Sequence, residues 1–117
     1  MKVLRGENMK IIVLGAGLVG VPMAIDLTKE STFEVTVADF SNEALNRVKA
    51  RETEVISMAR TTGYTATLAI RMIAEGLYTN KGISPPEYMG KYQECIDYMQ
   101  KGLKKRDVNW IISEEKI

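Results

Sequence analysis

The feature that most constrains the fold is a glycine loop that directly follows a short apolar run. The run is Ile11-Ile12-Val13-Leu14, and the loop is Gly15-Ala16-Gly17-Leu18-Val19-Gly20. An unbroken apolar run rich in β-branched side chains is typical of a parallel strand buried on both faces. In a strand–turn–helix unit, the first glycine makes the tight turn, the second lets a pyrophosphate approach the backbone, and the third lets helix and strand pack closely. The loop therefore predicts a βα unit that binds a dinucleotide.

The residues after the loop complete a βαβ unit and suggest a cofactor. Val21 to Lys29 has apolar residues at helical spacing, and Phe33 to Ala38 alternates as a strand does. Asp39 ends this strand 19 positions after Gly20, close to the ~20 residues expected for a carboxylate that binds the adenosine ribose. A carboxylate there repels a 2′-phosphate, and the next two residues supply no arginine, so the sequence favours NAD over NADP. The predicted cofactor contacts are Gly15, Ala16, Gly17, Leu18, Val19, Gly20 and Asp39.

Length and spacing predict a single α/β domain. A chain of 117 residues has the size of one domain with a modest core. Ser41 caps a short helix through Val48, and beyond it the sequence becomes charged and aperiodic, with no third βα unit. We expect a partial Rossmann-like parallel sheet of β-α-β-α order from residues 9–50, with the helical segment of residues 57–117 packed on it.

Two helices and a short last strand are expected in the C-terminal half. A helix that begins at Thr61-Thr62 is apolar nearly all round, so it should be buried. A second helix opens at Pro85-Pro86 and carries an apolar stripe at spacings of three and four, formed by Met89, Tyr92, Ile96, Met99 and Leu103. This stripe is expected to pack on the sheet or on a neighbouring helix rather than in a coiled coil. Val108 to Ile112 has the composition of a strand.

The inventory of catalytic side chains is small. The chain has no histidine and one cysteine, which excludes disulfide frameworks, histidine-containing zinc sites and Ser-His or Cys-His machinery. Cys95 is interpreted as a packing residue of its helix. Arg71 and Glu75, four positions apart, are expected to pair across a helix turn. No catalytic residue and no metal ligand is assigned.

Charge and hydropathy exclude two classes of partner. A formal net charge of +1 creates no field that would gather nucleic acid or an acidic membrane. The one dense basic cluster, Lys101, Lys104, Lys105 and Arg106, lies near a predicted helix end, where cations are favourable. No apolar stretch approaches the ~20 residues that span a membrane, and the N-terminus lacks the pattern of a secretion signal. We expect a cytoplasmic protein.

Two parts of the sequence resemble the same known family. Met9–Gly20 with Val35–Asp39 looks like the N-terminus of the saccharopine dehydrogenase-like enzymes, which include lysine 6-dehydrogenases. Ser57–Ala66, Arg71–Gly76 and Lys81–Glu87 resemble the C-terminal end of that family. In full-length members a substrate and dimerisation domain separates these ends, whereas here they are joined near residues 50–56. The resemblance implies cofactor contacts at the glycine loop and Asp39, and it leaves the family's catalytic residues without counterparts.

Two functions remain open from the sequence. The first is an NAD(P)-dependent oxidoreductase acting on amino-acid C–N bonds, in a truncated or internally deleted form without turnover of its own. The alternative is a non-catalytic dinucleotide-binding or assembly module. Because a two-stranded sheet leaves strand edges and apolar faces exposed, we also expect a homo-oligomer.

Overall fold

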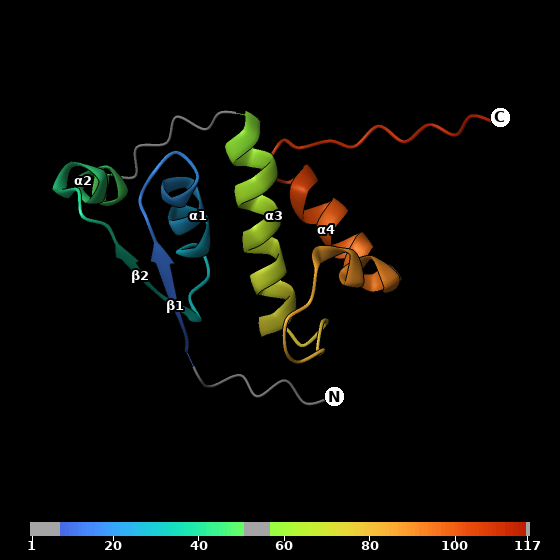
Figure 1. Ribbon diagram of the computed structural model, residues 1–117, viewed down its shortest axis with the longest axis horizontal. Helices are drawn as coiled ribbons and strands as arrows, with labels where there is room; N and C mark the ends of the chain where they lie inside the picture. The colour runs from blue at the N-terminus through green and yellow to red at the C-terminus, as the bar shows by residue number, and fades with distance from the viewer. Residues whose placement is uncertain (1–7, 51–56, 117) are drawn as a thin grey trace.

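The computed structural model describes residues 8–50 and 57–116 and shows two parallel strands with helices packed on one side (Figure 1). The elements, in chain order, are β1 (Met9–Leu14), α1 (Gly20–Leu27), β2 (Phe33–Ala38), α2 (Asn42–Ala50), α3 (Ser57–Ala74), the 3-10 helix η1 (Pro86–Lys91) and α4 (Gln93–Lys104). The predicted β-α-β-α order of a partial Rossmann-like fold is confirmed. The expected joint near residues 50–56 falls on residues 51–56, which lie outside the described residues.

The sheet is covered on one face only. β1 and β2 pair in parallel, from Met9 opposite Phe33 to Leu14 opposite Ala38. Val13 packs on α1, and α2 packs beside α1 on the same face. On the other face, 61% of Ile12 and 78% of Leu14 are exposed. The expectation of a strand buried on both faces is therefore wrong for the described residues, because both helices of the βαβα segment cover the same side.

The C-terminal helices extend the molecule away from the sheet. Figure 1 shows the sheet, α1, α3 and α4 following one another as successive layers. Helix α3 lies between α1 and α4 and begins at Ser57 rather than at Thr61. Its predicted burial is confirmed for Leu68 and Met72 but not for Ile73, which is 52% exposed. α4 approaches α3 closely at Gly102, where an added Cβ would lie 2.3 Å from a methyl carbon of Leu68.

The second predicted helix is divided into two. η1 and α4 are separated by Tyr92, whose backbone is extended at φ −112° and ψ 115°. Ile96, Met99 and Leu103 of the predicted stripe lie on α4. Met89 lies on η1 and packs, like Met99, against a core cluster formed by Met72, Tyr78 and Cys95. Cys95 is buried in this cluster, which confirms its interpretation as a packing residue.

The predicted last strand at Val108–Ile112 is wrong. α4 ends in a left-handed turn at Asp107, φ 60°, and the N–H of Val108 donates to the carbonyl of Leu103 at 3.0 Å. This is the Schellman pattern that stops a helix. The chain then leads away from the sheet (Figure 1), and Ile111 is 96% exposed. Because α1 and α3 lie between this segment and β1, its β-branched residues have no strand edge to pair with.

Candidate functional site

The glycine loop makes a turn that only glycine allows at two of its positions. Gly15 has a φ of +95°, a conformation that side chains disfavour. At Gly20, the first residue of α1, a Cβ would lie 1.9 Å from the carbonyl oxygen of Gly15. The helix therefore starts directly against the strand end, and the two glycines are required by the fold itself.

The middle of the loop is open and carries unpaired donors. A Cβ at Gly17 would meet no atom within 4 Å. Among the described residues, the backbone N–H groups of Gly17, Leu18 and Val19 have no protein acceptor. The first N–H groups of a helix and its dipole together attract anions. The loop thus presents a small backbone surface suited to a phosphate group.

Asp39 is tied to the glycine loop by hydrogen bonds. Its Oδ2 accepts from the backbone N–H of Ala16 at 2.7 Å, and its Oδ1 accepts from the N–H of Ser41 at 2.7 Å. The hydrogen bond from Ala16, followed by that from Ser41, lowers the pKa of the Asp39 carboxyl. The carboxylate therefore joins the end of β2 to the end of β1, a structural role that its sequence spacing did not reveal.

The structure brings all the predicted site residues together at the carboxyl ends of the two strands. Ala16, within the loop, is fully buried, whereas the side chains of Leu18 in the loop and Phe40 after β2 are exposed to solvent. Parallel α/β sheets bind ligands at this edge. Within the described residues the site is one-sided, since only β1 and β2 form the sheet.

A buried charge cluster at the other end of α1 was missed by sequence reasoning. Asp26, only 1% exposed, accepts from Nη1 of Arg71 at 2.7 Å, from Nε of Arg106 at 2.8 Å and from Oγ1 of Thr67 at 2.7 Å. Burial acts to raise the pKa of the Asp26 carboxyl, but the hydrogen bonds from Arg106, Thr67 and Arg71 outweigh it and lower the pKa. The cluster joins α1 to α3 and to the end of α4.

Two interpretations made from the sequence are corrected by this cluster. Arg71 does not pair with Glu75: its Nε donates to Glu30 at 2.8 Å, and Glu75 accepts from the Tyr98 hydroxyl at 2.8 Å. Arg106 belongs to the basic run at the end of α4, yet its side chain is only 15% exposed and pairs with Asp26. The available signal was one carboxylate, Asp26, in an otherwise apolar α1 and an arginine, Arg71, among the apolar residues of the C-terminal half of α3.

Neither Cys95 nor the acidic side chains of the described residues form a second reactive centre or a metal site. Burial, with a smaller effect of Glu94, raises the pKa of the Cys95 thiol, which disfavours a thiolate nucleophile. In residues 8–50 and 57–116, no three His, Cys, Asp or Glu side chains are grouped so as to hold a metal ion. None of the described helices is long and apolar enough to cross a bilayer.

A comparison with known protein families gives a match that covers the βαβα segment and α3. The family model described as the saccharopine dehydrogenase NADP binding domain matches residues 11–79, which is more than half of the chain. Its description supports a nicotinamide dinucleotide and favours NADP, against the NAD that we expected from the position of Asp39. No solved structure matches the chain.

Proposed function

Because the chain belongs to the saccharopine dehydrogenase NADP-binding domain family, we propose that Gly15–Gly20 and Asp39 are the residues with which it binds a nicotinamide dinucleotide. The observation that carries the proposal is the open backbone around Gly17, where the N–H groups of Gly17, Leu18 and Val19 have no acceptor in the described part of the chain. A pyrophosphate supplies strong acceptor oxygens for such groups, and the N-terminus of α1 stabilises its charge.

Each residue of the loop has a separate part in the proposed site. Gly17, Leu18 and Val19 donate their N–H groups to the pyrophosphate. Gly15 and Gly20 hold the turn in the only shape that the strand end permits. Asp39 fixes the loop through Ala16 and retains lone pairs on both oxygens for the ribose hydroxyls.

Replacing Gly17 with valine is the direct test of this site. The side chain would enter the open space above the loop, so we expect dinucleotide affinity to fall by about 100-fold or more, as the loss of two charge-assisted hydrogen bonds implies. Calorimetric titration with NAD, NADH, NADP and NADPH measures the change.

The matched control is Leu18→Ala, which removes an exposed side chain of the same loop without covering its backbone. Thermal unfolding should show that both variants fold, since Gly17 has room for a side chain. Equal dinucleotide affinity in the wild type and Gly17→Val would refute the assigned site.

The choice between the two cofactors is tested at Asp39. The family description favours NADP, while the carboxylate opposes a 2′-phosphate by like-charge repulsion. We expect Asp39→Ser to raise the ratio of NADP affinity to NAD affinity several-fold. A general loosening of the loop would weaken the binding of both cofactors alike and would therefore leave this ratio unchanged. The control is Glu34→Ser, which removes one negative charge from the exposed face of β2, away from the glycine loop, and should leave the ratio unchanged. If Glu34→Ser shifted the ratio as much as Asp39→Ser, the effect would not be local to the Asp39 carboxylate.

We further propose that this chain alone does not turn over a substrate. The resemblance points to oxidation at amino-acid C–N bonds, but neither a base of suitable placement nor a second wall of the cleft is found among the described residues. The assay is lysine- or saccharopine-dependent formation of NADH or NADPH, for which we expect no signal. Measurable turnover would favour a complete enzyme over the alternative of a dinucleotide-binding or assembly module.

Self-association through the uncovered face of the sheet is also proposed. Ile12 and Leu14 lie together on this face, beside the free edge of β1, and edges of this kind pair readily with other chains.

Light scattering across micromolar concentrations should show an oligomer, and Ile12→Lys should shift the equilibrium toward the monomer. Ile83→Lys changes a fully exposed isoleucine of the loop between α3 and η1 and serves as the control. A wild-type monomer throughout would exclude the proposal.

A further inference from the structure

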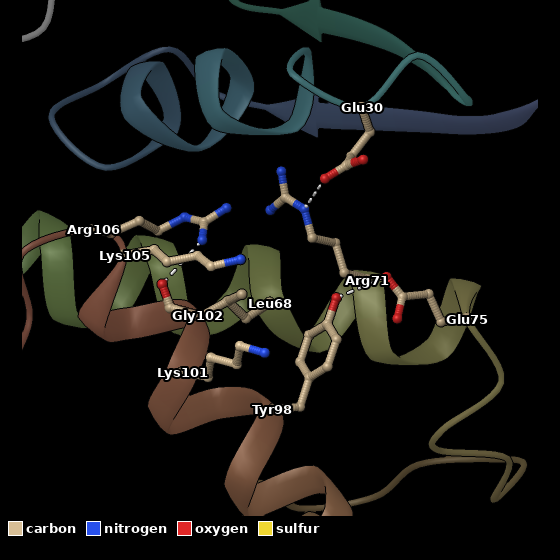
Figure 2. Close-up of a pocket in the computed structure, with 9 residues that line it drawn as sticks. All are labelled: Glu30, Leu68, Arg71, Glu75, Tyr98, Lys101, Gly102, Lys105 and Arg106. Carbon is tan, nitrogen blue, oxygen red and sulfur yellow. Dashed lines mark hydrogen bonds and ion pairs between the residues drawn. The ribbon is translucent and has the colours of Figure 1, made fainter.

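A cavity lies at the opposite end of α1 from the glycine loop. Figure 2 shows it between α3 and α4, with a volume of about 380 Å³, within the range of small-ligand sites. Its lining comes from three parts of the chain: Glu30 after α1, then Leu68 and Arg71 of α3 with Glu75 directly after that helix, and finally Tyr98, Lys101, Gly102, Lys105 and Arg106 of α4 and its end. The cavity therefore opens where the C-terminal helices dock on the βαβ unit.

The cavity is rich in positive charge. Four of its lining side chains are cationic and two are anionic, although the whole chain carries a net charge of only +1. Arg71 is 4% exposed and held by Asp26 and Glu30, which fixes its guanidinium at the inner wall. Arg106 is fixed beside it by Asp26 and by donation from its Nη1 to the carbonyl of Gly102 at 3.0 Å.

Lys101 and Lys105 are the cations that remain uncommitted. Neither ammonium forms an ion pair with a residue in the described part of the chain. Figure 2 shows both side chains extending from α4 into the space that Leu68 and Tyr98 border. Like charges four positions apart on a helix repel each other, and an anion between them would remove this repulsion.

The two carboxylates of the lining are already occupied. Glu30 accepts from Nε of Arg71, and Glu75 accepts from the Tyr98 hydroxyl. Each is thus drawn toward a donor on the wall, and neither neutralises the two lysines. The unsatisfied charge of the cavity is positive.

We propose that this cavity binds a small oxyanion, a phosphate or carboxylate group, between the ammonium groups of Lys101 and Lys105 and beside the guanidinium pair of Arg71 and Arg106. The site does not depend on the dinucleotide loop. Since α3, α4 and the end of α1 all contribute to it, the bound anion stabilises the docking of the C-terminal helices, as any ligand specific to the folded state does.

The test is a titration of the whole chain with inorganic phosphate and, separately, citrate at constant ionic strength, followed by calorimetry and thermal unfolding. We expect saturable binding and a rise in Tm that chloride does not reproduce. Lys101→Ala combined with Lys105→Ala should weaken binding by about tenfold or more, as the loss of charge-assisted contacts implies. Tighter phosphate binding would identify a phosphoryl ligand, and tighter citrate binding a carboxylate; either order supports the site.

Two control variants distinguish binding in this cavity from binding elsewhere on the chain. Lys104→Ala removes the same charge from an exposed position of α4 outside the cavity and should bind phosphate as the wild type does. Gly17→Val should also retain the binding, because the glycine loop is the other place where phosphate could bind. Equal affinity in the double variant and Lys104→Ala, or loss of binding in Gly17→Val alone, would overturn the proposal.

Discussion

Replacing Asp26 with asparagine is expected to lower the free energy of unfolding by about 3–5 kcal/mol, as removal of one member of a buried ion cluster does. The substitution keeps the volume of the side chain but leaves the Arg106 guanidinium without its counter-charge and Arg71 with Glu30 alone. Both are held by this one carboxylate, with donor–acceptor distances of 2.7 and 2.8 Å. The loss should separate α3 and α4 from α1.

Urea unfolding followed by circular dichroism measures the effect. Asp97→Asn is the matched control, because Asp97 is an exposed residue of α4 whose side chain accepts, within the described residues, from Gln93 alone. Its change should stay within about 0.5 kcal/mol, as for most surface substitutions. If Asp26→Asn were as mild as this control, the cluster would not be what joins the two parts of the chain.

The same carboxylate sets a dependence of stability on pH. The folded pKa of Asp26 is lowered from its ordinary value of 3.8, so the folded state favours the ionised form. This contribution is complete above the unfolded pKa and is lost as the pH falls through the folded pKa. We expect the wild type to lose stability below about pH 4, and Asp26→Asn to show a shallower decline over the same range. Parallel curves would contradict the assignment.

Replacing Gly20 with alanine is expected to destabilise the chain by about 2 kcal/mol or more, because the new Cβ would overlap a backbone atom. It would lie 1.9 Å from the carbonyl oxygen of Gly15, and neither the strand end nor the helix start can move without opening the turn. Alanine is favoured over glycine in a helix by about 1 kcal/mol, which is too little to offset the overlap. Dinucleotide binding should be lost together with the turn.

Gly17→Ala is the control, since it makes the same substitution three positions earlier in open space. We expect Gly17→Ala to keep its thermal stability and Gly20→Ala to lose it, as measured by thermal unfolding with and without dinucleotide. If the two variants were equally stable, the start of α1 would not pack as closely on the end of β1 as the structure shows.

Local features of the fold were predictable because they depend on neighbouring residues. The strand at Ile11–Leu14, the turn at Gly15 and the helix cap at Ser41 follow from side-chain shape and backbone freedom within a few residues. The Ser41 hydroxyl does accept from the N–H of Ala44 at 3.2 Å. The spacing of Asp39 from the glycine loop placed it at the same sheet edge, since both follow parallel strands.

The tertiary structure decided which charges pair and which apolar faces are covered. Arg71 has a carboxylate four positions away, yet it binds Asp26, which is 45 positions distant in the sequence, while Arg106 reaches the same carboxylate across 80 positions. Local spacing could not rank these partners, because a buried charge is stabilised by whichever opposite charge the packing of helices brings to it.

The sequence by itself determined the glycine loop, its strand and its helix, since these are set by backbone geometry at Gly15 and Gly20. Only the tertiary structure decided that Val108–Ile112 forms no strand and that Ile12 and Leu14 stay uncovered. A strand requires a partner for its hydrogen bonds and an apolar face requires a surface to pack on, and both depend on where distant elements lie.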